Sequence, residues 1–538
     1  MNPTDMTVQP LVSRLTESPE EVFVLLRSGT YVPSQETSPQ IETARQQVQE
    51  HEKIVLELKR DIARYQSLSS PIRKFPTEIF RIIFAFASGE NQLGGNYHWS
   101  SNAFRLAGVC SRWRDIAISS LELWAEIAVA VGEQAIPPMQ LCLDRSGIHP
   151  LSIQVSGGIQ ESEEKPEFVQ NFCRMLAEHS DRWRQLDLSE ADHTLIPYMA
   201  NHLEQAPMLE TVICSEWGSR LLEGACFDKA PNVRTVDFHF MNGAVPMDML
   251  DLLPWASLHH LTMEHDQQEL FDGLFEGLRC AKDLKSLEYT GDALLDGESY
   301  RAIDAALSEE DRFSLNIECL TIDMSRTRGF YDLLHDFFLP LILPSLTSLE
   351  IACKTPNGIR SGPRFRGSWP SEIIRQCFQR SRCSLTVLVL KGMPLTESDV
   401  ISVLLLVPSL QRFTLTEFGS NILCDAPPKA PQLITKWLLM RLRGLPTNNQ
   451  CTICPQLTYL ELRAQSHFDA DKEFVALLQS RQVANGGVER LRTVVLKVSG
   501  RKLSPELLKG ISGGMMVTLF DEGGRVDESK ETSDGSGS

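Results

Sequence analysis

The side chains in this sequence most able to do chemistry are two cysteines at zinc-ligand spacing, Cys451 and Cys454, and two adjacent histidines, His259 and His260. A structural zinc ion needs four such ligands, and no second cysteine pair or His-x-x-x-His motif lies near Cys451. The cysteine pair comes just before a strand-like run, so we interpret it as loop or core thiols. The histidine pair falls within another strand-like run without a nearby carboxylate motif, which favours a structural role.

Motifs for phosphate transfer, acyl transfer or metal-assisted hydrolysis do not occur in the chain. There is no Gly-x-x-x-x-Gly-Lys-Ser/Thr phosphate loop, no Gly-x-Ser-x-Gly nucleophile elbow and no His-Glu-x-x-His zinc motif. The acids Glu161, Glu163 and Glu164 are typical of a solvated charge run. We therefore predict a protein without enzymatic activity, cofactor or metal.

The composition narrows the class of protein. The 538 residues exceed one ordinary core and are 42% hydrophobic and 23% charged, which predicts two or more globular domains or a repeat array. A net charge of −18 argues against nucleic-acid binding, and the apolar run at residues 337–343 is too short to span a membrane. Thirteen cysteines without framework spacing predict reduced thiols, in the cytoplasm, the nucleus or both.

The N-terminal segments predict helices. Residues 1–40 have the pattern of a mostly disordered leader with one short helix, which begins at the capping residue Ser18 and stops at Gly29. Residues 41–69 follow a heptad pattern. Its two apolar positions are occupied by Ile41, Val48, Val55 and Ile62, and by Ala44, His51, Leu58 and Tyr65. We expect one amphipathic helix that packs back on its own protein or self-associates weakly through residues 41–68.

Residues 70–127 are predicted to form a separate compact module. Phe75-Pro76 opens one helix, residues 104–117 supply a second apolar cluster, and Leu123-Trp124 closes the segment. Short helices with this much aliphatic and aromatic surface cannot bury all of it internally, because small units bury a smaller share of their surface. The excess predicts a docking face for another protein.

Three runs in this module, taken in order, resemble the F-box domain. Residues 75–84 are similar to its opening Leu-Pro-x-Glu-Ile-Leu-x-x-Ile-Phe, residues 109–114 to Val-Cys-x-x-Trp-Arg, and Leu123-Trp124 to the closing Leu-Trp. Residues 68–74 and the heptad helix before them resemble the leader of a large family of mushroom-type fungal F-box proteins. The motifs cover residues 41–127, which is under a fifth of the chain.

This resemblance implies a substrate receptor of a Skp–cullin–F-box ubiquitin ligase, which docks on the Skp-type adaptor, and through it on cullin, for ubiquitin-dependent protein degradation. Carried over by position, the candidate adaptor contacts are Phe75, Pro76, Ile79, Ile83, Phe84, Leu106, Val109, Cys110 and Trp113. Trp113 and Trp124 also fit the internal core of the module. The insertion at residues 88–102 departs from the family's pattern, and we predict that it is a surface loop.

A Leu-x-x-Leu-x-Leu skeleton recurs through the rest of the chain. Its last two apolar positions are Leu186/Leu188, Val212/Cys214, Val236/Phe238, Leu261/Met263, Leu287/Tyr289, Leu320/Ile322, Leu349/Ile351, Leu388/Leu390, Phe413/Leu415, Leu460/Leu462 and Val494/Leu496. The first four intervals are 26, 24, 25 and 26 residues, about one strand plus one helix, and a weaker copy at Leu433 splits the 47-residue gap after Leu410. Because strand side chains alternate, we expect each pair to point inward.

Proline precedes the first apolar position of six copies by two residues, at Pro207, Pro231, Pro344, Pro408, Pro431 and Pro455. Proline there keeps the preceding helix from running into the strand. The copies resemble the leucine-rich repeats of F-box receptors. This implies an α/β fold with an N-terminal helical segment, a three-helix F-box and a solenoid, irregular because the usual Asn or Cys of the repeat is absent. We expect a linking segment and first turns at 128–182, the solenoid at 183–520 and a disordered acidic tail at 521–538.

Outward-pointing strand positions of such a solenoid would hold an unidentified substrate protein. The candidates are Asp237, His239, Glu264, Glu288, Asp323, Glu350, Lys391, Arg463 and Lys497. They are acidic in the first half and mixed to basic in the second. This predicts either a bipolar groove that orients the substrate or ordinary charged positions that confer solubility. The alternative for the whole chain is a non-catalytic leucine-rich-repeat scaffold without ligase coupling.

Overall fold

The computed structural model describes a set of ranges that together cover most of the chain. They are residue 27 and residues 34–94, 101–157, 166–192, 195–215, 226–239, 247–265, 270–291, 312–324, 330–353, 369–393, 395–417, 432–443, 453–465, 467–484, 487–503, 515–521 and 524–528. The chain divides into two compact units, Met1–Phe80 and Arg81–Ser538. The short helix predicted at residues 18–29 lies outside the described residues, apart from Arg27.

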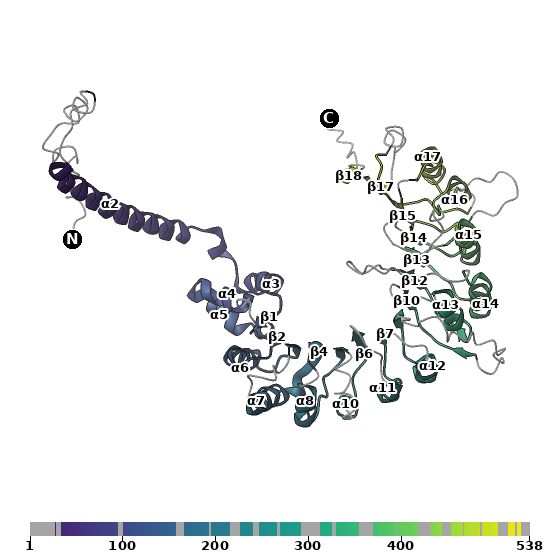
Figure 1. The fold of residues 1–538 in the computed structure, drawn as a ribbon, viewed down its shortest axis with the longest axis horizontal. Coiled ribbons are helices and arrows are strands. Elements are labelled where there is room, and N and C mark those ends of the chain that lie inside the picture. Colours follow the sequence, from purple (N-terminus) through teal and green to yellow (C-terminus); the bar gives the residue numbers. More distant parts are fainter. Residues whose placement is uncertain are drawn as a thin grey trace. The chain divides into compact units, whose positions relative to one another are not determined.

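The first unit is dominated by one long helix. α2 (Ser34–Leu68) is followed by the 3₁₀ helix η2 (Pro71–Lys74) and by the first turn of α3 (Thr77–Ala87) (Figure 1). α2 begins at Ser34, earlier than the heptad pattern predicted. No described apolar side chain of residues 41–68 is buried, and exposure ranges from 46% at Ile54 to 74% at Tyr65. The heptad stripe is therefore uncovered along its whole described length.

The second unit contains a 16-stranded sheet in which the strands follow the order of the chain. All of its pairs are parallel except β17–β18, which confirms the α/β class. The strands are β1 (Asn91–Leu93), β2 (Glu126–Ala130), β3 (Leu151–Gly157), β4 (Trp183–Ala191), β5 (Thr211–Ser215), β6 (Thr235–His239), β7 (His260–His265), β8 (Ser286–Gly291), β10 (Cys319–Asp323), β12 (Ser348–Ala352), β13 (Val387–Lys391), β14 (Arg412–Thr416), β15 (Tyr459–Ala464), β16 (Thr493–Val498), β17 (Met516–Asp521) and β18 (Gly524–Glu528). A separate small pair joins β9 (Phe313–Ser314) to β11 (Leu341–Ile342).

Helices connect the strands, and Figure 1 shows those from α6 onward along one side of the sheet. They are α4 (Asn102–Val109), α5 (Ser111–Ser119), α6 (Ile136–Ser146), α7 (Pro166–Ala177), α8 (Ile196–His202), α10 (Cys226–Lys229), α11 (Met247–Leu252), α12 (Leu270–Cys280), α13 (Phe330–Phe338), α14 (Ser371–Ser381), α15 (Glu397–Leu406), α16 (Lys436–Leu442) and α17 (Asp471–Ser480), with the 3₁₀ helices η3 (Leu121–Trp124), η4 (Glu133–Ala135) and η5 (Ser180–Arg182). The opposite face of the sheet carries the outward strand side chains.

The parallel register aligns the sequence repeats. Their second apolar positions pair strand to strand in one row: Leu186, Val212, Val236, Leu261, Leu287, Leu320, Leu349, Leu388, Phe413, Leu460 and Val494. Every member is at most 1% exposed, so the predicted inward direction is confirmed. Burying one such side chain contributes about 1.5–3 kcal/mol, and each is covered only when the neighbouring strands are in place.

A proline turn delivers the chain to five of these strands. Pro207, Pro231, Pro344, Pro408 and Pro455 each follow a residue whose carbonyl accepts a hydrogen bond from the N–H three residues later. Leu209 N–H, for example, donates to Ala206 O at 3.1 Å. Proline thus occupies the second position of a tight turn, where its fixed φ suits the geometry. The predicted sixth proline, Pro431, lies outside the described residues.

The repeat predicted to begin at Leu433 is wrong, because β14 pairs directly with β15. The N–H groups of Leu433 and Ile434 instead donate to Glu417 Oε1 at 2.9 and 2.8 Å, and Gln465 N–H donates to Glu417 Oε2 at 2.7 Å. Glu417 is buried at 3% exposure. Its carboxylate accepts the hydrogen bonds that these N–H groups would donate to a neighbouring strand. The apolar residues that follow belong to α16.

The sheet is longer at both ends than the repeats predicted. The insertion at 88–102, predicted to be a surface loop, contains β1, which pairs with β2. β2 and β3 belong to the sheet as well, in the region where a linking segment and first turns were predicted at 128–182. At the far end β17 and β18 run to Glu528, beyond residue 521, where the disordered tail was predicted to start. Val517 pairs with Val494 in the inward row and is buried, although no full repeat skeleton precedes it.

Buried cations join helices of neighbouring repeats. Arg481, fully buried just after α17, donates through Nε to Leu442 O at the end of α16, at 3.0 Å. Its Nη2 donates to Ile453 O and Cys454 O, each at 3.2 Å. A helix leaves its last carbonyl groups without partners inside the helix, and here the next repeat supplies the donor. Burial lowers the pKa of Arg481 to about 10, so it remains protonated at neutral pH.

The same arrangement recurs along the unit. Arg182, Lys229 and Arg380 donate to Leu143 O in the last turn of α6 and to Leu203 O and Leu339 O directly after α8 and α13, at 3.4, 2.7 and 2.8 Å. Each cation lies at or next to the end of its own helix and reaches back to the preceding one. A positive charge near a helix C-terminus also complements the helix dipole. Side-chain donors therefore bridge successive helices at four places along the row.

Arg481→Met is expected to lower the free energy of local opening of α16 and α17 by about 2–4 kcal/mol, because carbonyl groups out of water lose their donor. Hydrogen exchange of the α16 and α17 amides measures this change. Arg490→Met removes an exposed arginine nearby and should change the same quantity by less than about 0.5 kcal/mol. Equal protection in the two variants would show that Arg481 does not join the helices.

Candidate functional site

Aromatic side chains hold α3, α4 and α5 together in the second unit. The ring centroids of Phe84 and Trp113 are 5.0 Å apart, and Phe104 stands edge-on to Trp124 at 5.2 Å. Trp124 is fully buried, and its indole N–H donates to Ala117 O at 2.8 Å. The interpretation of Trp124 as a core residue is therefore confirmed. Trp113 is only half-buried.

A buried asparagine in the insertion fastens these helices to the sheet. Asn91 Nδ2 donates to Leu123 O at 2.7 Å and to Glu126 O at 3.0 Å. Asn91 Oδ1 accepts from the hydroxyl of Ser101, which also caps α4 by accepting from Phe104 N–H. The insertion thus carries the residue that ties the start of α4 to β2. A shorter loop in place of the insertion at 88–102, without Asn91, would remove this connection between α4 and β2.

The candidate adaptor contacts differ in exposure. Phe75, Pro76 and Ile79 in the first unit and Ile83, Val109 and Cys110 in the second are exposed, Leu106 and Trp113 are half-buried, and Phe84 is completely buried. Val109, 60% exposed at the end of α4, is the most open of the apolar candidates. The exposed members can meet a partner without any rearrangement of the helices.

Phe84 is a correction to the candidates, because its ring packs against Trp113 and is 0% exposed. Phe80 is four residues earlier and is also buried, so the two share the buried side of α3. Ile82 and Phe86 lie on the exposed side, at 53% and 88%, and were missed. The sequence signal for them is the spacing of four residues between Ile82 and Phe86, because side chains four apart share one side of a helix.

The outward side chains of the sheet form rows because the register is parallel. Asp237 and Glu288 lie in one row with Thr262 between them. Glu350 lies farther along the same row, beyond Thr321. The neighbouring row runs from the acidic candidate Asp323 through Ala352 to the basic candidates Lys391, Arg463 and Lys497, with Thr416 between Lys391 and Arg463. The structure therefore separates the acidic from the basic candidates along the sheet, as the sequence predicted.

Not every substrate candidate is accessible. Asp237, Glu288, Glu350 and Lys391 are half-buried, and Arg463 and Lys497 are exposed. Asp323 is 5% exposed, so its expected place on an open groove is wrong; it lies at the end of β10, opposite Ala352 of β12. The side chains of His239 and Glu264 lie outside the described part, although both residues belong to strands.

Ion pairs on the outward face reduce its charge locally. Lys391 Nζ lies 2.8 Å from Glu350 Oε1, and this ion pair joins the two neighbouring rows of outward side chains. Arg463 Nη2 lies 2.7 Å from Glu461 Oε1. No ion pair of Lys497 occurs among the described residues. At the mixed-to-basic end of the predicted groove, the exposed Lys497 side chain and the exposed part of the Arg463 side chain are therefore accessible to a partner.

A tyrosine connects this end of the face across two strands. Tyr459 O–H donates to Glu461 Oε2 at 3.0 Å, and the guanidinium of Arg412 lies 4.7 Å from the Tyr459 ring centroid. Burial and the Glu461 carboxylate raise the pKa of Tyr459, so its proton stays in place as the hydrogen-bond donor. Tyr459 thus holds Arg412 and Glu461 in place on the outward face.

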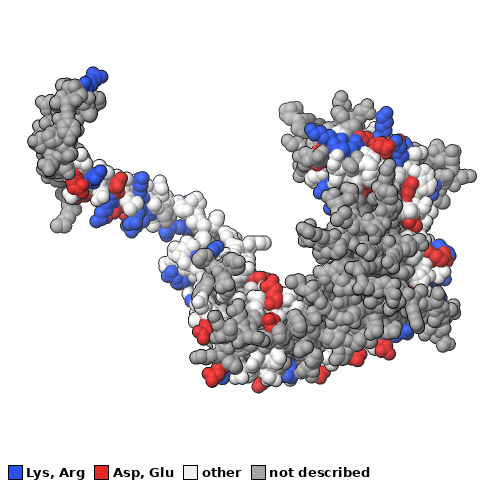
Figure 2. Space-filling model, in the orientation of Figure 1, with Lys and Arg blue, Asp and Glu red and all other residues white. Residues whose placement is uncertain are grey.

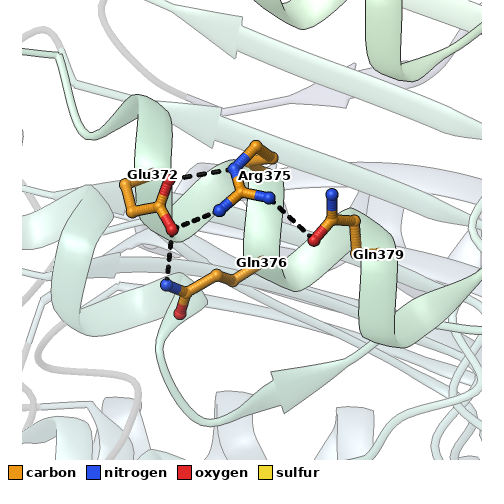
Figure 3. Close-up of polar contacts among 4 residues, drawn as sticks. All are labelled: Glu372, Arg375, Gln376 and Gln379. Atoms are coloured by element: carbon orange, nitrogen blue, oxygen red, sulfur yellow. Dashed lines mark hydrogen bonds and ion pairs between the residues drawn. The ribbon is translucent and has the colours of Figure 1, made fainter.

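The helix side of the unit offers a contrasting surface on α14. Arg375 donates to Glu372 and Gln379, and Gln376 donates to Glu372 (Figure 3). Hydrogen bonds from Arg375 and Gln376 lower the pKa of Glu372. These polar groups, spaced three and four residues apart, have partners within one helix. The surface is therefore a weaker docking candidate than the outward sheet face.

The cysteine and histidine pairs carry no ligand set in the described residues. Cys454 is buried with Sγ 3.8 Å from Leu404 O, and burial raises its pKa to about 12; Cys451 lies outside the described part. No cluster of three or more His, Cys, Asp or Glu suited to a metal ion occurs within the described ranges. Among described helices, none has the length and apolarity needed to cross a membrane.

Comparison with known proteins assigns no family. No protein-family model matches the chain, and no curated protein sequence matches it. Function is therefore inferred from the exposed apolar helices and the charged sheet face.

Thiol reactivity should distinguish the exposed candidate Cys110 from the buried Cys454. At mildly alkaline pH, iodoacetamide should label Cys110 roughly tenfold faster or more, because the thiolate is the reactive form and a pKa of about 12 leaves almost no Cys454 ionised. Timed quenching followed by peptide mass spectrometry measures both rates. The difference should disappear in concentrated urea. Equal rates in the folded protein would contradict the burial of Cys454.

Proposed function

We propose that this chain is the substrate-recognition subunit of a Skp–cullin–F-box ubiquitin ligase. The observation that carries the proposal is the set of exposed apolar side chains Ile82, Ile83, Phe86 and Val109 on α3 and α4, within the segment whose motifs resemble an F-box. Association is favourable because it removes apolar surface from water. The partner would be the Skp-type adaptor, and through it cullin.

The mechanism is recruitment, in which apolar anchors supply the affinity. Phe86 is 88% exposed, and full burial of such a side chain contributes about 1.5–3 kcal/mol. A few anchors of this kind usually dominate an interface. The half-buried Leu106 and Trp113 would support the exposed anchors from below, and no bond needs to be made or broken on this chain.

The sheet of the second unit would then be an irregular leucine-rich-repeat solenoid that binds the substrate protein. Support for this comes from the chain-order parallel strands, the continuous buried row and the recurring turn at proline. Stacked repeats of this kind bury a core that no single repeat can close. Their outward strand positions would present a broad binding face.

A non-catalytic scaffold without ligase coupling is the second candidate. The observation in its favour is the insertion at 88–102, because β1 and Asn91 tie α4 to the sheet in a way that departs from the F-box pattern. Co-purification separates the two functions. Adaptor together with cullin supports the receptor, and partner proteins without either support the scaffold.

Ile83→Asp combined with Val109→Asp should weaken binding of the Skp-type adaptor by more than about tenfold, since each change places a charge on an apolar anchor. Titration of the full chain with purified adaptor measures the dissociation constant. Circular dichroism of the variant should be unchanged, because both side chains are exposed.

Ile148→Asp is the matched control, because Ile148 is 88% exposed and lies after α6, outside the F-box-like segment. It should leave adaptor binding unchanged. Bound adaptor should also slow alkylation of Cys110. If the double variant binds as tightly as the unaltered chain, the adaptor-docking role of these helices is wrong.

We also propose that α2 self-associates through its heptad positions. Ile41, Val48, Val55 and Ile62 fill one position with β-branched residues, which favours two-stranded coiled coils. Each is between 48% and 56% exposed, and isolated helices gain most of their stability from packing an apolar face. A second copy of the chain offers the same stripe.

Val48→Asp combined with Val55→Asp should lower the fraction of dimer at a given concentration by roughly tenfold or more, because charges would enter the helix–helix seam. Sedimentation velocity across a dilution series measures that fraction. Gln49→Asp adds a charge one residue away, outside the seam, and should have little effect. If the unaltered chain stays monomeric at every concentration, the proposed pairing of α2 helices is wrong.

A further inference from the structure

Charge changes sign along the outward face of the sheet. From β5 to β12 the main-sheet strands contain five carboxylates, Asp237, Glu264, Glu288, Asp323 and Glu350, and no Lys or Arg. From β13 to β16 they contain four cations, Lys391, Arg412, Arg463 and Lys497, and one carboxylate, Glu461. Figure 2 shows Lys and Arg, interspersed with Asp and Glu, near the C-terminal end of the second unit. An anionic partner is therefore attracted to the strands from β13 to β16.

The single carboxylate of this region is already occupied. Glu461 accepts hydrogen bonds from the Tyr459 hydroxyl at 3.0 Å and from Arg463 Nε at 2.7 Å. Its side chain is 14% exposed, whereas that of Arg463 is 48% exposed. Glu461 thus lies beneath the cations and orients Arg463, while Tyr459 supports Arg412 through its ring. The surface that a partner meets is positive.

Arg463 and Lys497 are direct cross-strand partners in the register of β15 and β16. Like charges placed directly opposite each other destabilise a pair of strands. Neighbouring strands are about 4.8 Å apart, so both charges can contact one anionic group or two adjacent ones. An anion bound between them would remove the repulsion, and this makes the pair suited to binding.

The geometry points to a binding site for a short acidic peptide segment on the outward face of β14, β15 and β16. Asp or Glu carboxylates of the segment accept hydrogen bonds from Arg412, Arg463 and Lys497. The Tyr459 ring lies beside Arg412, and its hydroxyl donates to Glu461, which also accepts from Arg463. The inference rests on the proposed receptor function, since it assigns a chemical class to the substrate that the sheet would hold.

The size of the patch selects a short segment. Arg412 and Lys497 lie two strand spacings apart across the sheet, about 10 Å, and four residues apart along the strands, about 13 Å. About five extended residues span the roughly 16 Å between them. A long polyanion such as nucleic acid would continue over the carboxylates of β5 to β12, which repel it, and the whole chain carries a net charge of −18. A peptide with a few clustered carboxylates avoids that repulsion.

The test uses the full chain and a fluorescein-labelled peptide in which consecutive Asp and Glu residues are flanked by Gly. Fluorescence anisotropy should show binding at low ionic strength that weakens as salt is added. The same peptide with Asn and Gln in place of the acids should bind at least about tenfold more weakly. Arg412→Gln and Lys497→Gln should each weaken binding of the acidic peptide by roughly three- to tenfold.

Arg375→Gln is the matched control, because it removes one positive charge from α14, on the helix side of the sheet (Figure 3). It should leave peptide affinity within about twofold, since its charge is screened from the outward face. Equal binding of the neutral peptide, or equal loss in Arg375→Gln and Lys497→Gln, would overturn the inference.

Adaptor binding is measured on the same variants, so that the two proposals can fail separately. Lys497→Gln should retain full adaptor affinity. Loss of acidic-peptide binding with intact adaptor binding supports the peptide site. A chain that binds the adaptor but discriminates neither peptide retains the receptor function and loses the acidic-substrate assignment. If the chain distinguishes the acidic from the neutral peptide but does not bind the adaptor, the acidic-peptide site stands and the protein is a scaffold instead of a ligase receptor.

Discussion

The repeats of the second unit are held to one another by the need to satisfy helix ends out of water. Carbonyl groups at or just beyond the ends of α6, α8, α13 and α16 accept hydrogen bonds from Arg182, Lys229, Arg380 and Arg481, each supplied by an element later in the chain. On the sheet side, the inward apolar row is dry only where both neighbouring strands are present. A single repeat would leave charged, polar and apolar groups uncompensated, so neighbouring repeats are stable only together.

This coupling gives the outward face of the sheet a fixed geometry. The rows of Asp237 and Glu288, and of Lys391, Arg463 and Lys497, keep their spacing because the parallel register is continuous beneath them. Pre-organised charges lose little conformational freedom on binding, so a partner with complementary charge can be recognised by a few contacts. The helices α3 to α5 use a different principle, in which aromatic packing inside the group turns aliphatic side chains outward.

The apolar skeleton of the repeats was sufficient to predict the strands and their inward pairs, because a strand period of two and a fixed register leave few alternatives. The same reasoning failed where a buried side chain forms hydrogen bonds with backbone groups. Glu417 accepts hydrogen bonds from the N–H groups of Leu433 and Ile434. The leucine pattern that begins there leads into helix α16 instead of a strand. Asn91 similarly draws a Gly-rich insertion into the sheet edge. A single buried polar residue decided each case.

The candidate interaction surfaces divide in the same way. By itself, the sequence determined which segments are apolar, where the strands lie and on which strands acids and bases occur, since these follow from local pattern. Only the tertiary structure decided that Phe84 is core while Phe86 is open, that Asp323 is buried, and that Lys391 forms an ion pair with Glu350. Exposure and ion pairing depend on neighbours that are distant in sequence, and the local pattern does not contain those distances.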